Sequence, residues 1–299
     1  MLAVLLMTTL PGNVVVAPGR SDLPTATLSH PQSGASCEVI LGGAHVTSWK
    51  AADGVERLFV SSASKYGAGA AIRGGIPVCW PQFSDRGSLP KHGFLRTSDE
   101  WEIEQMETGE DGATQLVLCL KDSETSRAVW PHAFKVTYCI KLTAATLTTV
   151  LEVFNAGDEP IEFTTALHTY FAVPDVASVR VVGLQGLQYE DNTAGRAVSR
   201  EEPEELAISG EVDRVYIDAP ERVVLRTPER AELIVEKSTS FHDLVVWNLG
   251  EAKAPSMADL GEGEWRHYVC LEAAAIAKPV QLPAGESFSA KQMFTVQGL

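Results

Sequence analysis

The sequence is short of positive charge. Its 299 residues contain 24 lysines and arginines against 39 aspartates and glutamates, which gives a net charge of −15. Nucleic acids and anionic membrane surfaces attract clustered cations, so neither is expected as a partner. One small phosphate group needs only about two or three local cations, and it remains compatible with this charge balance.

Cysteines are also few and scattered. The five of them form no C-x-x-C pair, which argues against a disulfide scaffold or a zinc knuckle and favours reduced thiols in the cytoplasm. The seven histidines show no spacing typical of metal ligands. No P-loop, no G-x-S-x-G turn and no H-E-x-x-H motif occurs. We therefore expect neither a metal nor a cofactor.

Long apolar runs are missing as well, so no segment is expected to span a membrane. The first ten residues, MLAVLLMTTL, are apolar but short, and a targeting remnant is one interpretation of them. We expect residues 1–20 to form a partly disordered extension and residues 21–299 to form a single domain. With 45% hydrophobic residues the chain can build a sizeable core, and we expect a monomer.

Long amphipathic helices are absent, and strand patterns replace them. In Phe134–Leu142, apolar residues occupy every second position, as a strand with one buried face requires. Short helices are expected at Ser64–Ala71 and Pro255–Leu260, and a surface excursion at Asp191–Asp213. The fold class is therefore all-β, a large antiparallel β-sandwich or barrel. Similar strand patterns occur at Cys37–Leu41, Gln115–Lys121, Leu147–Phe154, Ile161–Leu167, Arg222–Arg226, Glu232–Glu236, Leu244–Trp247, His267–Leu271 and Ser287–Val296.

Two segments place cations in a stiff backbone. Arg73 opens a run rich in glycine and proline, where proline fixes φ and glycine permits close backbone approach. Lys91, His92 and Arg96 follow soon afterwards around Gly93. These residues could form ordinary surface ion pairs, or they could line a cationic pocket for phosphate, which arginine binds with two hydrogen bonds.

Two further polar residues stand at the ends of apolar strands. His168 follows Ala166-Leu167, and Glu272 follows Val269-Cys270-Leu271. A strand histidine is commonly structural, and a buried carboxylate commonly forms a salt bridge. The alternative is a tuned acid and base, because an unpartnered buried carboxylate costs several kcal/mol.

Several blocks in one order resemble the hexose-6-phosphate mutarotases, a branch of the aldose 1-epimerase-like family also called glucose-6-phosphate 1-epimerases. The matching blocks extend over residues from about 30 to 297. They are R-G-G-I-P-V-x-W-P-Q-F at Arg73–Phe83, H-G-F-x-R at His92–Arg96, A-L-H-T-Y-F at Ala166–Phe171, V-D-R-V-Y at Val212–Tyr216, V-V-W-N at Val245–Asn248 and C-L-E-A at Cys270–Ala273.

The resemblance implies a galactose mutarotase-like supersandwich that needs no metal. It implies His168 as the catalytic acid and Glu272 as the catalytic base. The substrate-binding residues that it implies are Arg73 and Arg96 for the sugar and phosphate, Asp213 for sugar hydroxyls, and Lys91 and His92 beside them.

Such an enzyme would open the sugar ring and close it on the other face of C1. A base must take the proton of the C1 hydroxyl while an acid protonates the ring oxygen. The expected substrate is a phosphorylated hexose, with glucose 6-phosphate favoured. An aldose 1-epimerase of unphosphorylated hexoses and a non-catalytic carbohydrate-binding β-sandwich are the alternatives.

Overall fold

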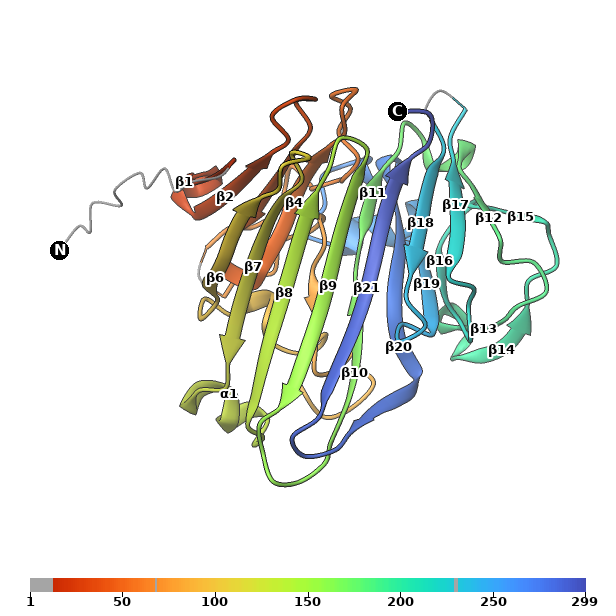
Figure 1. The fold of residues 1–299 in the computed structure, drawn as a ribbon. Coiled ribbons are helices and arrows are strands. Elements are labelled where there is room, and N and C mark those ends of the chain that lie inside the picture. The colour runs from red at the N-terminus through yellow and green to blue at the C-terminus, as the bar shows by residue number, and fades with distance from the viewer. Residues whose placement is uncertain (1–12, 68, 229–230) are drawn as a thin grey trace.

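The computed structural model describes residues 13–67, 69–228 and 231–299. Antiparallel strands dominate these residues, and Figure 1 shows them as broad sheets packed in layers. The predicted all-β, antiparallel sandwich is therefore confirmed. Most of the expected extension at residues 1–20 lies outside the described residues, but strand β1 (Val14–Pro18) already pairs with β2 (Pro24–Ser29). Within the described residues, no helix is long and apolar enough to cross a membrane.

The described residues form three sheets, and strands β6, β7, β8, β9, β21 and β18 run side by side across Figure 1. The four-stranded sheet continues from β1 and β2 to β3 (Ser36–Ile40) and β4 (His45–Lys50). The eight-stranded sheet has the order β14 (Ala197–Arg200), β13 (Gln188–Asp191), β16 (Val212–Tyr216), β19 (Asp243–Asn248), β20 (Tyr268–Leu282), β10 (Ile161–Leu167) and β5 (Val78–Cys79), with β11 (Tyr170–Ala172) also on β20. The nine-stranded sheet has the order β15 (Glu205–Ala207), β12 (Arg180–Val182), β17 (Arg222–Arg226), β18 (Leu233–Lys237), β21 (Ser287–Val296), β9 (Thr146–Asn155), β8 (Phe134–Leu142), β7 (Thr114–Lys121) and β6 (Glu102–Thr108).

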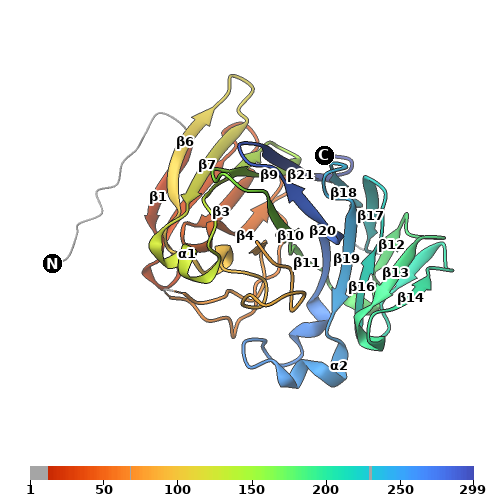
Figure 2. The same ribbon diagram turned by 90° about the horizontal axis from the view of Figure 1, so that it is seen from below.

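Helices are short in the described part of the chain. In Figure 2 the segment with α2 lies beyond the ends of β16, β19 and β20. The α-helices are α1 (Glu124–Val129) and α2 (Gly250–Lys253). The 3-10 helices are η1 (Arg20–Asp22), η2 (Gly42–Ala44), η3 (Leu95–Thr97), η4 (Val176–Ser178), η5 (Asn192–Ala194), η6 (Ala254–Ser256) and η7 (Glu264–His267).

The strand predictions agree with the structure apart from shifts at several ends. Strand β8 has the predicted bounds, and its apolar positions are buried in strict alternation. The helix expected at Ser64–Ala71 is wrong, because no described residue of that segment is helical. The helix expected at Pro255–Leu260 is reduced to η6. The excursion expected at Asp191–Asp213 contains two strands. Strand β14 belongs to the eight-stranded sheet and β15 to the nine-stranded sheet.

One apolar core holds the three sheets together. The ring of Phe294 on β21 lies 6.0 Å from that of Trp49 on β4 and 4.9 Å from that of Phe171 on β11. All three side chains are fully buried. Because Phe294 belongs to the nine-stranded sheet, Trp49 to the four-stranded and Phe171 to the eight-stranded sheet, this contact joins all the layers. Truncating a buried phenylalanine of this kind costs about 3–5 kcal/mol.

Candidate active site

The eight-stranded sheet carries His168 in the short link between β10 and β11. Strand β10 ends at Leu167, and the backbone N–H of His168 donates to the carbonyl of Pro77 at 3.0 Å. The histidine is 7% exposed. This backbone bond holds the ring at the end of the strand, beside the loop that leads into β5.

Glu272 approaches this histidine from the first half of β20. One carboxylate oxygen, Oε1, lies 3.4 Å from Nδ1 of His168, and the glutamate is 1% exposed. Among the described residues, Nδ1 of His168 and the second oxygen, Oε2, of Glu272 have no hydrogen-bond partner. The two residues predicted as acid and base are therefore brought together, with unpaired polar atoms between them.

Burial sets the charges of this pair. It raises the pKa of Glu272 well above its usual range, and the negative charge of Asp213 adds to the increase. Burial likewise lowers the pKa of His168 well below its usual range, with further lowering from His92, Arg73 and Arg96. A neutral carboxylic acid beside a neutral imidazole is thus favoured. A base at Glu272 and an acid at His168 require a carboxylate and an imidazolium, and this charged pair differs from the neutral pair only by the position of one proton.

Aromatic rings enclose His168. The ring of Tyr170 stacks on it at 4.7 Å with an interplanar angle of 9°. The rings of His92 and Trp247 meet it edge-on, each at 5.5 Å. His92 accepts a hydrogen bond at Nδ1 from the backbone N–H of Ser84 at 3.3 Å, and burial with the nearby cations lowers its pKa to about 2. The imidazole of His92 is therefore neutral, and the rings restrict how His168 can rotate.

A second cluster fixes Arg73. Its Nε donates to Oδ1 of Asp259 at 3.2 Å, and one terminal nitrogen donates to Oδ2 at 3.0 Å. The other terminal nitrogen donates to the hydroxyl of Tyr170 at 3.1 Å. This two-pronged pairing is the geometry in which arginine is most tightly oriented. The alternative that Arg73 forms an ordinary ion pair is therefore confirmed. The same guanidinium also contacts the hydroxyl of Tyr170, whose ring stacks on His168.

The remaining predicted residues lie around this centre in two cavities. Lys91 and Asp213 line a cavity of about 430 Å³, where Oδ1 of Asp213 accepts a hydrogen bond from Asn192 at 2.6 Å. Arg96 lines a different cavity, of about 340 Å³. Its terminal nitrogen donates to the backbone carbonyl of Lys91 at 3.0 Å, so the Arg96 side chain lies beside the Lys91 backbone. Neither Lys91 nor Arg96 has an ion-pair partner among the described residues.

Sequence reasoning missed several members of this region. Asp259 lies just after η6, in a segment that the sequence presented as a helix, and nothing in its local pattern distinguished it. Asn192 belongs to the predicted surface excursion. Tyr170 stood inside the A-L-H-T-Y-F block, and an aromatic two residues after the predicted acid was the one signal that could have identified it.

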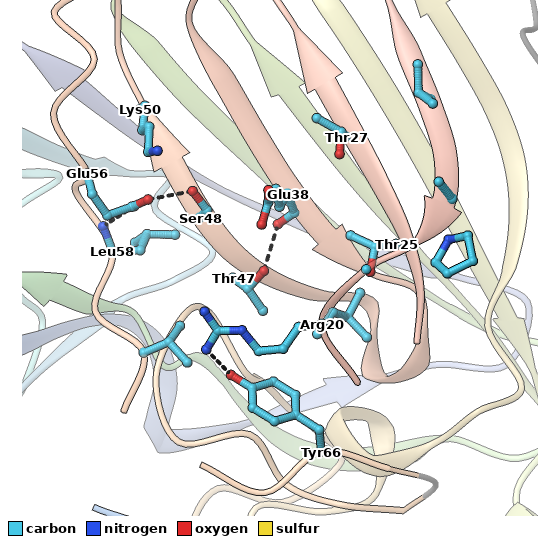
Figure 3. A pocket seen from close by; sticks show the side chains of 16 residues that line it. Arg20, Thr25, Thr27, Glu38, Thr47, Ser48, Lys50, Glu56, Leu58 and Tyr66 are labelled. Atoms are coloured by element: carbon cyan, nitrogen blue, oxygen red, sulfur yellow. Dashed lines mark hydrogen bonds between the residues drawn. The ribbon is translucent and has the colours of Figure 1, made fainter. Parts of the chain in front are cut away.

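A larger hollow lies on the polar face of the four-stranded sheet. Figure 3 shows this cavity of about 500 Å³, in which Arg20 donates to the hydroxyl of Tyr66 and Ser48 donates to Glu56. It contains none of the site residues predicted from the sequence. Because the predicted acid, base and cations all lie elsewhere, size alone does not make this hollow the functional site.

Solved structures of other proteins share the whole fold. A protein described as a putative mutarotase, from Salmonella typhimurium, superposes with a TM-score of 0.86 at 27% identity and covers 97% of this chain and 96% of its own. A galactose mutarotase related enzyme from Lactobacillus acidophilus superposes with a TM-score of 0.69 at 19% identity, covering 88% and 95%. The chain therefore has the β-sandwich of the mutarotase-like proteins.

Sequence comparison narrows the assignment. A relative from Cenchrus ciliaris, named "Putative glucose-6-phosphate 1-epimerase", is 35% identical over 258 residues, which cover 84% of this chain and 78% of the relative. One of the same name from Escherichia coli is 34% identical over 257 residues, which cover 85% and 83%. The aldose 1-epimerase family matches residues 24–295. The chain belongs to the aldose 1-epimerase family, which confirms the resemblance found in the sequence.

Proposed function

We propose that this protein interconverts the α and β anomers of a hexose 6-phosphate, with glucose 6-phosphate as the favoured substrate. The observation that carries the proposal is the contact between His168 and Glu272, buried and 3.4 Å apart. The two curated relatives named above carry the same activity in their names. A sugar as small-molecule ligand fits the family.

Ring opening requires that one proton leave the C1 hydroxyl and that one reach the ring oxygen. His168 and Glu272 share one proton, which can reside on either residue. The C1 hydroxyl of the sugar would donate to the Glu272 carboxylate, and this hydrogen bond favours the charged form. The proton would then lie on His168, which would pass it to the ring oxygen. Rotation about C1–C2 and the reverse transfers would close the ring on the other face. Proton transfers of this kind contribute about 10²–10⁴-fold in rate.

Phosphate recognition is assigned to the unpaired cations. Arg73 already shares its charge with Asp259, so we assign it to orienting the sugar. The Arg96 side chain contacts the Lys91 backbone, and neither cation has a carboxylate partner among the described residues. A charged hydrogen bond contributes about 1.5–3 kcal/mol, and phosphate offers several acceptors. Asp213, held by Asn192, would bind sugar hydroxyls, and neutral His92 would lie beside the ring.

The decisive measurement is anomer exchange followed by NMR, with glucose 6-phosphate and free glucose at equal concentrations. We expect strong acceleration for the phosphorylated sugar and a much smaller effect on glucose. Equal acceleration would assign the protein to unphosphorylated hexoses. No acceleration with retained sugar binding would make it a non-catalytic carbohydrate-binding protein.

Charge-removing variants test the phosphate assignment. Lys91→Gln and Arg96→Gln should each raise the KM for glucose 6-phosphate about tenfold or more, because each removes a charged hydrogen bond. The KM for glucose should stay unchanged. Lys141→Gln, on the exposed face of β8, is the matched control and should alter neither value.

A cytoplasmic location and a monomeric state remain predictions from the sequence.

A further inference from the structure

A buried thiol lies beside the histidine and glutamate. Cys270 precedes Glu272 by two residues on β20, so both side chains lie on the same face of the strand. A ring nitrogen of His168, the sulfur of Cys270 and a carboxylate oxygen of Glu272 all lie within 4.8 Å of one another. All three residues are buried. The thiol has no part in the proton transfers described above.

These donors form a set that zinc prefers. Zinc binds imidazole nitrogen, thiolate sulfur and carboxylate oxygen at about 2.0–2.3 Å in tetrahedral sites, so its donors lie roughly 3.5 Å apart. The 3.4 Å between His168 and Glu272 already matches this spacing. Since the three donor atoms already lie within 4.8 Å of one another, the sulfur must move by only roughly one ångström to complete the site.

Unpaired lone pairs are available at the same place. Nδ1 of His168 and Oε2 of Glu272 are buried without a hydrogen-bond partner among the described residues. Buried polar atoms of this kind carry a desolvation cost that a bound ligand can relieve. This is an observation independent of the clustering, and it concerns the atoms that a metal would need.

We propose that His168, Cys270 and Glu272 form a binding site for a thiophilic divalent cation, Zn²⁺, and that the bound ion blocks anomer exchange. The block rests on the proposed function, whereas the binding does not. On binding, the thiol and the carboxylic acid would each release a proton to solvent, and His168 would bind as neutral imidazole. A fourth position would remain for water. The ion would occupy the proton-carrying groups, so the sugar could not be opened.

The inhibition experiment uses the full chain, freed of metal with a chelator and then titrated with Zn²⁺. One equivalent should slow exchange of glucose 6-phosphate about tenfold or more, and excess chelator should restore the rate. In Cys270→Ala the loss of one ligand should raise the zinc concentration needed by at least about 10–100-fold, the loss that removing a mere outer-shell partner of a ligand already causes. The matched control is Cys79→Ala, because Cys79 is equally buried on β5, which β10 separates from β20, and lies outside the donor set. It should behave like the wild type.

A second readout does not depend on activity. Cd²⁺ bound to a thiolate gives a charge-transfer absorption in the ultraviolet, which should appear in the wild type and in Cys79→Ala and be absent in Cys270→Ala. If Cys270→Ala does not fold, Glu272→Gln serves instead, and its cadmium affinity should fall by at least about 10–100-fold, the loss typical of changing an outer-shell partner.

Three outcomes would overturn the metal site: no thiolate band in the wild type, an unchanged band in Cys270→Ala, or equal zinc sensitivity of the Cys270→Ala variant. A thiolate band in the wild type, together with no catalysed exchange in the metal-free wild type or its variants, would overturn the proposed function. The metal site would still stand.

Discussion

The guanidinium of Arg73 is paired with both carboxylate oxygens of Asp259, at 3.2 and 3.0 Å. Both side chains are partly exposed, at 19% and 23%. The pair connects the loop before β5 with the segment after η6, two regions far apart in the sequence. Since the same guanidinium also contacts Tyr170, its orientation is set from two sides.

Asp259→Asn should release one side of this arrangement. The arginine would keep its charge but lose its two-pronged partner, so we expect the KM for the sugar to rise about tenfold with a smaller change in kcat. Saturation curves from the NMR exchange assay measure both constants. Asp53→Asn, which breaks the corresponding pair with buried Arg57, is the control and should leave the KM unchanged. Equal KM values in the wild type and Asp259→Asn would show that the clamp does not position the substrate.

Glu272→Gln should abolish exchange while keeping the fold. An amide cannot take the hydroxyl proton, so the rate should fall by about 10²–10⁴-fold. The glutamate is buried and its pKa is raised, which means that the neutral amide resembles the form favoured by the fold. The melting temperature from calorimetry should therefore not decrease at neutral pH. A large loss of stability with retained exchange per folded molecule would contradict both parts.

The same variant tests the sign of the pKa shift. The folded state keeps the Glu272 proton at pH values where the unfolded chain has released it. The free energy of unfolding of the wild type, relative to Glu272→Gln, should thus decrease as pH rises from the usual carboxyl range toward the raised pKa. Urea unfolding at several pH values measures this difference, and an increase with pH would refute the shift.

His45 should make the protein sensitive to acid. Burial lowers its pKa from 6.5 to about 4, while Nε2 donates to the carbonyl of Gly74 at 2.8 Å. Between these pH values the unfolded chain binds a proton that the folded protein does not. Stability should therefore fall as pH decreases through this window, by about 1.4 kcal/mol per pH unit from this residue.

The variant His45→Gln should remove that contribution. Its free energy of unfolding should depend less steeply on pH between about 4 and 6.5. Above that window the two curves should run parallel, which provides the internal control. Identical slopes throughout the window would show that His45 titrates equally in both states.

Gly93 holds the backbone next to His92 and is expected to tolerate no side chain. Its φ is +68°, and a Cβ atom would overlap the carbonyl of Trp80. Gly93→Ala should cost about 2–4 kcal/mol and reduce exchange, because the loop that carries His92 must move. Gly34→Ala is the matched control, with a φ of +74° and open space around the added atom. It should cost only about 1 kcal/mol, and equal losses in both variants would mean that the close approach is unimportant.

Much of the fold was predictable because strand signals are local. Strands β8, β10, β17 and β21 begin and end where the sequence pattern places them. Errors occurred where local preference is weak. The segment around residues 64–71 is rich in alanine and glycine, and its described residues contain no helix. Strands β14 and β15 form from a polar stretch because partner strands are present.

The candidate site was predictable as a set of residues but not as a geometry. His168, Glu272, Arg73 and Arg96 could be named from short blocks of sequence, yet Asp259 could not, and Cys270 was given no role although it lies in the C-L-E-A block. Their relevance depends on contacts between residues distant in the chain. The proposed metal site of His168, Cys270 and Glu272 could not be recognised from sequence spacing for the same reason.

By itself the sequence determined the strand pattern, the excess of acidic over basic residues and the identity of the groups able to move protons. Only the tertiary structure decided that Tyr170 of β11 pairs opposite Cys270 of β20, which brings His168 against Glu272. It also decided the charges of these groups. Residue type specifies a usual pKa, but desolvation and neighbouring charges exist only once distant strands have packed together.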